Sequence, residues 1–262
     1  MDMQEYPRFR GSLPDWETRE GKYLIRFAGN HEDLDKILKL RFDVFNLELG
    51  EGLESSFFTG RDLDDYDPVC HHLMVIEEAS GEIVGTYRVH TSAMAAAANG
   101  FYSAAEFDLS HLPQDVLEDS VEIGRACVAR EHRNTQALFL LWKGLASYVS
   151  YNRKRFLFGC CSLTSQDQRV GKLVMESLER GGYLRRDFYA PPRFGVECYP
   201  PGFQVSEPVE VKLPKLFRTY LRFGAKVCGP PAVDRSFKTI DFFVIFDVLA
   251  MESQARRTFF EE

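Results

Sequence analysis

Two charged side chains, Glu122 and Arg125, interrupt the apolar, β-prone run 121–128, which otherwise has the composition of a buried strand. Buried charges are costly unless they are paired. In a regular strand, residues three apart point to opposite faces. Gly124 lies between the two charges, and a glycine within a strand often marks a β-bulge, which adds one residue and resets the alternation. With a bulge at Gly124, Glu122 and Arg125 face the same cleft, which indicates a functional site.

Four more charged residues join Glu122 and Arg125 as candidates for a partly buried network. Arg41 lies on the apolar stripe of a predicted helix, about 31–47, and therefore needs a carboxylate partner. Arg88 lies on a half-buried strand, and Asp64 and Asp67 belong to an acid-rich segment. Three acids and three arginines balance in sign, as a partly buried network requires. A network that only braces the fold and a functional site are both consistent with this spacing.

The bulk composition predicts one large domain. The chain has 262 residues, of which 45% are hydrophobic, enough for a full core over 1–262, with 1–21 as a loosely held lead-in. The net charge of −7 argues against general nucleic-acid binding. No apolar run approaches the ~18 residues of a membrane span. The polar, acidic start Met-Asp-Met-Gln-Glu is unlike a secretory signal, so a cytoplasmic location is expected.

Cysteine and histidine spacing gives no metal-ligand pattern. The six cysteines form no CxxC pair, which favours reduced core cysteines, with a catalytic thiol at Cys127 as the alternative. His71 and His72 open a predicted strand, and hydrogen-bonded core or edge histidines are favoured over catalytic ones. No third ligand stands at a recognisable distance from them, so no metal site is predicted.

Strand-like and helix-like patterns are mixed along the chain. Apolar runs and alternation predict strands over 23–27, 72–77, 83–91, 121–128, 156–163 and 241–249. Helical spacing predicts helices over about 31–47, 135–152, 168–180 and 213–223, with a small helix and loop over 92–119.

Four charged motifs, taken in order, resemble those of the acyl-homoserine-lactone autoinducer synthases. They are Arg41-Phe-Asp-Val-Phe45, Asp64-Asp-Tyr-Asp67, Val84-Gly-Thr-Tyr-Arg88 and Glu122-Ile-Gly-Arg125. The chain is still more similar to the hemolysin-like N-acyltransferases, which include ornithine and glycine lipid synthases and long-chain N-acyl amino acid synthases. Phrases such as Leu140-Leu-Trp-Lys-Gly144 and Phe158-Gly-Cys-Cys-Ser162 carry this second likeness. The resemblance covers about 23–249 and implies an α/β GNAT-like fold, with a central mixed, mostly antiparallel sheet flanked by helices.

Two departures narrow what the resemblance implies. Autoinducer synthases usually carry a tryptophan after the glycine that follows their first motif, whereas Gly50 is followed by Glu51, which counts against an S-adenosylmethionine pocket. Common CoA-dependent GNAT enzymes wrap a pyrophosphate with a glycine-containing loop at a helix start, and the equivalent stretch 130–137 has no glycine. A phosphopantetheine arm has a single phosphodiester, so acyl carrier protein is the better donor.

The resemblance and the expected burial together make Glu122 the candidate base that takes the proton of an attacking amine. Its alternative role is an ion-pair brace for Arg88 or Arg125. The two arginines are the other predicted catalytic residues, because they orient Glu122 or bind a substrate carboxylate. Backbone N–H groups near 124–128 are expected to hold the oxyanion. The predicted substrate-binding residues are Arg41, Phe45, Asp64, Asp67, Cys127, Val128 and Ser162.

We therefore expect an acyltransferase that moves a long-chain acyl group from acyl carrier protein to the amine of an amino acid or small amine. No tightly bound cofactor is expected, because the acyl-phosphopantetheine of the carrier protein is the donor. Basic clusters at 153–155 and 212–226 suit an acidic carrier protein or peripheral contact with the inner membrane face. The alternatives are an autoinducer synthase and a non-catalytic acyl-carrier or lipid-binding module.

Overall fold

The computed structural model describes residues 5–207 and 209–260. The chain folds into two compact units: unit 1 comprises Met1–Gly100, Val121–Lys154 and Arg256–Glu262, and unit 2 comprises Phe101–Ser120 and Arg155–Ala255. The expected single domain over 1–262 stays a prediction. Among the described residues, no helix is long and apolar enough to cross a membrane.

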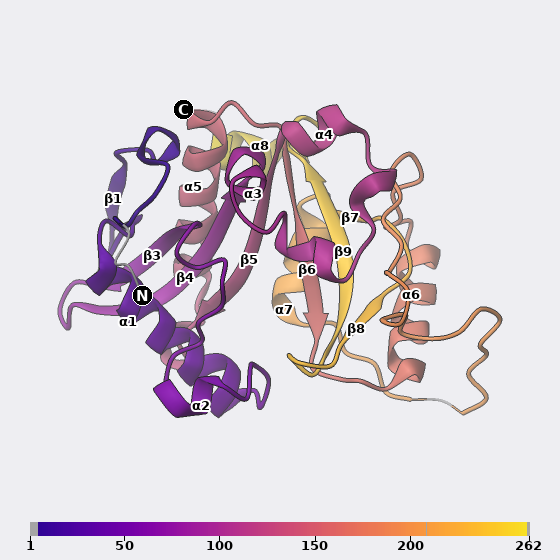
Figure 1. Cartoon of the computed structure of the whole chain (residues 1–262). Helices are drawn as coiled ribbons and strands as arrows, with labels where there is room; N and C mark the ends of the chain where they lie inside the picture. The colour runs from indigo at the N-terminus through magenta and orange to yellow at the C-terminus, as the bar shows by residue number, and fades with distance from the viewer. Residues whose placement is uncertain (1–4, 208, 261–262) are drawn as a thin grey trace. The chain divides into compact units, whose positions relative to one another are not determined.

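Unit 1 contains an antiparallel sheet in which each strand pairs with the next along the chain (Figure 1). Its strands are β1 (Glu17–Glu20), β2 (Tyr23–Phe27), β3 (His71–Glu77), β4 (Glu82–Thr91) and β5 (Ser120–Val128). The hairpin of β3 and β4 and the bounds of β2 confirm the prediction. Strand β1 is a correction, because its residues were expected in a loosely held lead-in. Its pairing with β2 fixes it in place.

Two helices pack on opposite faces of this sheet. Helix α1 (His31–Phe42) starts at Asn30, whose side chain accepts a hydrogen bond from the Asp33 N–H, and it buries an apolar face against Met74 of β3. Leu73, the residue before Met74 in β3, points to the opposite face of the sheet, and helix α5 (Thr135–Tyr151) packs against it there. Gly144 permits this close approach, because a Cβ there would lie 2.5 Å from a Leu73 methyl carbon.

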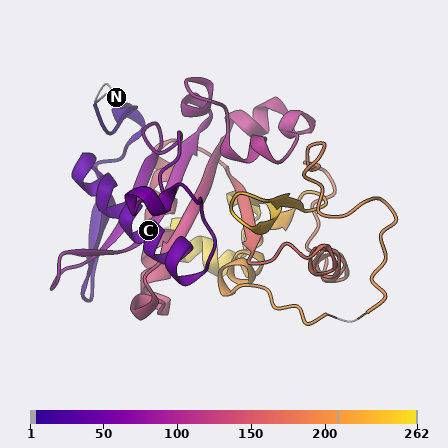
Figure 2. The same cartoon turned by 60° about the horizontal axis from the view of Figure 1, so that its bottom comes forward.

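Several short helices complete unit 1 (Figure 2). Helix α1 continues into a π-helical turn, η2 (Asp43–Glu48), so the predicted helix over 31–47 is present but changes its winding at Asp43. Beyond it come α2 (Ser56–Thr59) and α3 (Ser92–Ala96). Phe259 of α8 (Ser253–Phe260), a helix that was not predicted, packs on Trp142 and Phe139 of α5.

Unit 2 is built on an antiparallel pair, β6 (Phe156–Leu163) and β9 (Thr239–Asp247), to which β7 (Lys226–Val227) and β8 (Ala232–Asp234) add short antiparallel strands. Its helices are α4 (Gln114–Glu118), α6 (Gln168–Arg180) and α7 (Lys215–Arg222). Helix α6 is seen almost end-on in Figure 2. The predicted bounds of β6 and α6 are confirmed, and β7 and β8 were missed. The α/β fold with a mostly antiparallel sheet is confirmed.

The apolar face of α7 is not free to enter a membrane. Phe217, Tyr220 and Leu221 are buried, and the Phe217 ring packs against Phe242 of β9. Its exposed face carries Lys215, Arg218 and Arg222. The structure therefore leaves this helix a basic surface. Peripheral contact with the inner membrane face stays a prediction, to which the buried side chains of Phe217, Tyr220 and Leu221 supply no apolar contact.

Candidate active site

A β-bulge lies next to Gly124, as predicted, but one step further along the strand. Thr86 pairs with Cys127 and Arg88 with Gly124, so one residue of β4 stands opposite two of β5, Arg125 and Ala126. Arg125 itself has φ +49°, a left-handed conformation that costs a non-glycine residue about 1 to 3 kcal/mol. The surrounding contacts must hold Arg125 in this conformation.

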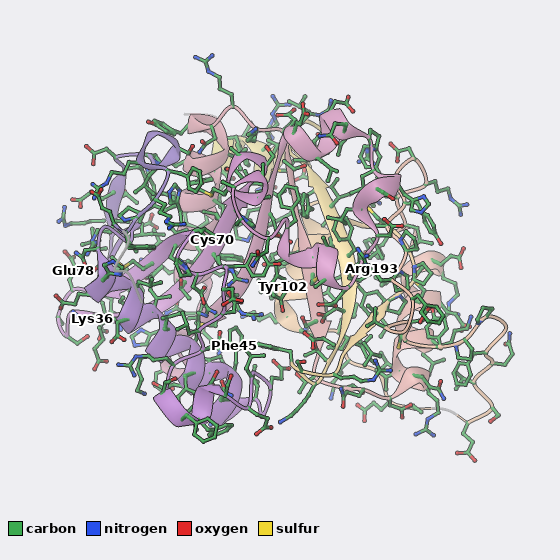
Figure 3. All side chains as sticks on the ribbon, in the orientation of Figure 1. Lys36, Phe45, Cys70, Glu78, Tyr102 and Arg193 are labelled. Atoms are coloured by element: carbon green, nitrogen blue, oxygen red, sulfur yellow. The ribbon has the colours of Figure 1, made fainter. Side chains whose placement is uncertain are left out.

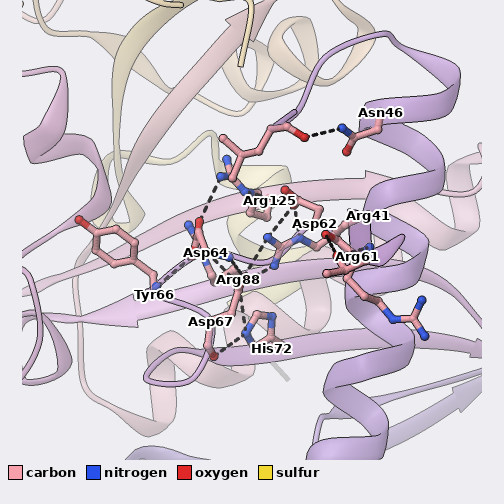
Figure 4. Close-up of polar contacts among 12 residues, drawn as sticks. Arg41, Asn46, Arg61, Asp62, Asp64, Tyr66, Asp67, His72, Arg88 and Arg125 are labelled. Carbon is pink, nitrogen blue, oxygen red and sulfur yellow. Dashed lines mark hydrogen bonds and ion pairs between the residues drawn. The ribbon is translucent and has the colours of Figure 1, made fainter. Parts of the chain in front are cut away.

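Those contacts come from a buried ion-pair network, shown in Figure 4. Arg41, fully buried on α1, donates through Nε to Asp62 Oδ2 at 2.7 Å. Its Nη1 and Nη2 donate to the two carboxylate oxygens of Asp67 at 2.6 and 3.2 Å, a bidentate pair. Arg41 thus has the carboxylate partner that its place on an apolar stripe requires, and that partner is Asp67. Asp62 is a second partner that the sequence analysis did not single out.

The remaining acid, Asp64, joins the two predicted catalytic arginines. Arg88 Nη1 donates to Asp64 Oδ1 at 2.6 Å and to Asp67 Oδ1 at 2.9 Å. Arg125 Nη2 donates to the other oxygen of Asp64 at 3.1 Å, and its Nε lies 3.4 Å from Asp62 Oδ2. The bulge thus brings the Arg125 side chain to the face of the sheet on which Arg88 lies, and the three arginines and three aspartates form one connected cluster.

The charges of this cluster are mutually stabilised. Burial alone would raise the pKa of Asp67, but the guanidinium groups of Arg41 and Arg88 outweigh it and hold the pKa far below its usual value. Burial likewise disfavours the charged form of Arg88, yet Asp64 and Asp67 raise its pKa well above the ordinary value. Asp67 and Arg88 are therefore ionised at neutral pH.

The two neighbouring histidines are core residues, as favoured from the sequence. His71 is hydrogen-bonded to the Tyr148 hydroxyl at 2.9 Å and to the Arg8 carbonyl at 2.7 Å. The Nε2 atom of His72 lies 3.2 Å from the backbone carbonyl oxygen of Asp67. Burial lowers the pKa of each histidine to about 4, so both are neutral at physiological pH. His72 contacts the network through Asp67, whereas His71 contacts Tyr148 and Arg8.

Glu122 is buried on β5, with 4% of its surface exposed, directly opposite His90 of β4. The His90 Nδ1 and Glu122 Oε2 atoms lie 3.3 Å apart. The Tyr66 ring makes an edge-on contact with the His90 ring. The Arg88 Cζ atom lies over the Tyr66 ring, 5.6 Å from the ring centroid. Glu122, His90 and Arg88 thus share one face of the sheet, which gives this face a carboxylate, an imidazole and two guanidinium groups.

Of the other predicted site residues, Phe45, Cys127 and Val128 lie in unit 1 and Ser162 lies in unit 2. Phe45 is buried on the π-helical turn η2, a feature frequent at functional sites, and Cys127 and Val128 end strand β5. Burial raises the pKa of Cys127 to about 12, which argues against the alternative of a catalytic thiol there. All six cysteines are free. Ser162 belongs to unit 2, on β6, and forms no part of the unit 1 cluster.

Comparison with known proteins agrees with the resemblance of the charged motifs to those of N-acyltransferases. Residues 40–143 match the profile of the acetyltransferase (GNAT) domain. An L-ornithine N(alpha)-acyltransferase of Agrobacterium fabrum is 30% identical over 247 residues, covering 88% of this chain and 82% of its own. The enzyme of the same name from Rhodobacter capsulatus is 31% identical over 250 residues, covering 89% and 93%. The chain belongs to the GNAT-type N-acyltransferase family that contains these enzymes.

This N-acyltransferase also shares its fold with a solved structure. FeeM, an N-acyl amino acid synthase from uncultured soil microbes, superposes with a TM-score of 0.50 at 10% identity, covering 87% of this chain and 91% of that one. At such low identity the likeness concerns the fold alone. It agrees with the fold class expected from the motifs.

Sequence reasoning missed three residues that contact the predicted site residues: Asp62, His90 and Tyr66. Asp62 lies in the same acid-rich segment as Asp64 and Asp67, but a loop has no periodicity that tells which acids turn inward. His90 had a signal, since it alternates with Arg88 on β4 and its partner across the strand pair is Glu122. The tertiary contact of Tyr66 has no comparable signature.

Proposed function

We propose that this enzyme transfers a long-chain fatty acyl group from an acyl carrier protein thioester to the amine of an amino acid, giving an N-acyl amino acid. The observation that carries the proposal is the buried Glu122 carboxylate opposite His90, beside a strained bulge held by ion pairs. The relatives named L-ornithine N(alpha)-acyltransferase support an amino-acid acceptor.

In the proposed reaction, the neutral amine attacks the thioester carbonyl carbon and forms the new C–N bond. Glu122 accepts the proton that the nitrogen loses, directly or through water. The tetrahedral intermediate then expels the thiolate of the phosphopantetheine arm. As the C–S bond breaks, the thiolate takes the proton from Glu122, directly or through water, which returns Glu122 to its starting state. A thiolate is a good leaving group, so this step needs no strong acid.

His90 is a positioning residue in this scheme. An Nδ1–H donated to Glu122 Oε2 fixes the position of the carboxylate. The bulge supports oxyanion binding, because two β5 residues opposite one β4 residue leave a backbone group outside the regular ladder.

The start of helix α5 supports a carrier-protein donor. The N-cap residue Asn134 accepts a hydrogen bond from the Ala137 N–H at 2.9 Å, so one donor at this helix end is already used within the chain. No glycine in 130–137 lets the backbone approach a pyrophosphate closely. A donor with a single phosphodiester therefore suits this segment better than CoA.

The test is an assay of amide formation with Glu122→Gln. With acyl carrier protein thioesters and an amino-acid panel, we expect the wild type to form an amide and the variant to lose about 10²- to 10⁴-fold in kcat. Glu82→Gln, the same change at an exposed position of unit 1, is the matched control and should retain full activity. Equal rates for wild type and Glu122→Gln would remove Glu122 as the base.

The donor is tested separately by comparing acyl carrier protein thioesters with CoA thioesters of the same chain length. A higher kcat/KM with the carrier protein is expected. Binding of carrier protein without any amide product, unchanged in Glu122→Gln, would instead identify a non-catalytic binding module.

A further inference from the structure

Unit 2 holds three metal-ligand side chains that the proposed acyl transfer does not use. One ligand-type atom from each of Glu106, Cys160 and Asp241 lies within 4.8 Å of the other two. All three residues belong to unit 2, and Cys160 and Asp241 lie on β6 and β9, the strand pair on which this unit is built. Because the ligands come from three separate segments, no local spacing marks them, and the sequence analysis predicted no metal site.

The backbone that carries Glu106 is fixed against the rest of unit 2. Glu106 follows the short helical turn η3 (Tyr102–Ala105), which Tyr102 marks in Figure 3. Its carbonyl oxygen accepts a hydrogen bond from the Arg193 N–H at 2.7 Å. The next residue, Phe107, is fully buried in the core of this unit. The Glu106 side chain therefore starts from a defined place beside the two strands.

Asp241 carries the observation that points to a cation. Its side chain is 4% exposed, and its Oδ1 atom has no hydrogen-bond partner within the described residues. Glu106, the second acid of the group, is 6% exposed. A buried carboxylate oxygen without a partner is costly, and a second ionised carboxylate close to it adds repulsion. A cation bound between the two acids would remove both penalties.

The ligand chemistry of the group selects zinc among the common divalent cations. Zn²⁺ accepts both thiolate and carboxylate ligands, whereas Mg²⁺ and Ca²⁺ require oxygen ligands. With Zn–S near 2.3 Å and Zn–O near 2.0 to 2.2 Å, the ligand atoms of a tetrahedral site lie roughly 3.3 to 3.6 Å apart. The three atoms already lie within 4.8 Å of one another, so small side-chain rotations bring them to this spacing.

We propose that Glu106, Cys160 and Asp241 bind one zinc ion, with a water molecule at the fourth position. The hydroxyl of buried Ser103 lies 3.7 Å from Cys160 Sγ and is placed to donate to the thiolate. Ser162, exposed and directly opposite Asp241 in the strand pairing, marks the side from which the ion enters. The zinc joins the segment that carries Glu106 to β6 and β9 and so stabilises unit 2. This site goes beyond the proposed acyl transfer and does not depend on it.

Zinc binding by the full chain, purified without a histidine tag, tests the site. The protein is stripped with a chelator, and its zinc content and affinity are then measured by elemental analysis and by competition with a chromophoric chelator. We expect one zinc per chain. Cys160→Ser and Asp241→Asn should each weaken the affinity by more than the roughly 10- to 100-fold that loss of a ligand's hydrogen-bond partner costs. Two controls should bind zinc like the wild type: Cys161→Ser, on the opposite face of β6, and Glu179→Gln, an exposed acid of unit 2.

Cobalt substitution identifies the thiolate ligand. Co²⁺ bound to a thiolate gives a sulfur-to-metal charge-transfer band in the near ultraviolet, which the wild type and Cys161→Ser should show and Cys160→Ser should lose. A wild type without this band would overturn the site, whether or not the variants fold. Zinc uptake that Cys160→Ser and Asp241→Asn leave unchanged would overturn it as well. Zinc should also raise the melting temperature of the wild type. None of these measurements uses an acyl donor, so they decide the zinc site whatever the amide assay shows.

Discussion

Replacing Asp67 by asparagine removes one negative charge from a cluster that the fold encloses. Asp67 is fully buried and accepts hydrogen bonds from Arg41, Arg88 and the backbone N–H of Asp64. Three arginines then face two aspartates, and one positive charge is left without compensation. Removal of one partner from a buried ion pair costs about 3 to 5 kcal/mol. We expect Asp67→Asn to lower the free energy of unfolding by this amount.

Urea denaturation at pH 7 measures the change, and the same loop provides the control. Asp65→Asn makes an identical substitution at an exposed position, where the effect should stay within about 0.5 kcal/mol. A second test adds Arg41→Met to Asp67→Asn, which restores charge balance. The double variant should be more stable than the sum of the single changes predicts, by at least about 2 kcal/mol. An Asp67→Asn variant as stable as Asp65→Asn would refute the view that this network is charged and enclosed.

Two further outcomes follow from the packing and titration of unit 1. Because burial holds the pKa of His71 and His72 near 4, below the ordinary 6.5, the unfolded chain binds protons first as pH falls. Stability should therefore decline between pH 6.5 and 4 by about 3 kcal/mol for each histidine, and His71→Gln should remove roughly half of that slope in urea denaturation. Gly144→Ala should lower the free energy of unfolding by about 1 to 3 kcal/mol, because its Cβ would meet Leu73 at 2.5 Å. The control Gly11→Ala meets no atom within 4 Å and should be neutral, and equal melting temperatures for the two variants would contradict this packing.

The elements that sequence reasoning placed correctly are those with a strong hydrophobic period. Strand β6 and helix α6 have the predicted bounds because an apolar run or an amphipathic stripe marks each of them. Strand β1 has no such mark, since its residues Glu-Thr-Arg-Glu are all polar. Pairing with β2 and a surface ion pair of Arg19 with Glu78 define it, and neither is visible in the local sequence.

The candidate site shows the same division between local and tertiary information. The sequence indicated a bulge beside Gly124, because glycine tolerates unusual backbone conformations. The left-handed residue is instead Arg125. Its ion pair with Asp64 and the nearby Asp62 carboxylate come from a loop about 60 residues away, and these contacts outweigh the local preference. Which acid meets which arginine is likewise decided by the fold and not by the spacing of the charges.

The retention of six charges in this part of unit 1 needs an explanation other than stability. Apolar side chains of the same volume often stabilise a core as well as a buried ion-pair network does. The network, however, fixes the conformation of Arg125 and with it the register of β5 against β4. A slip of one residue in that register would turn Glu122 to the opposite face of the sheet, away from His90. In the proposed mechanism, the charges of Arg41, Arg88 and the aspartates therefore keep the Glu122 carboxylate in one place, as proton transfer from an attacking amine requires.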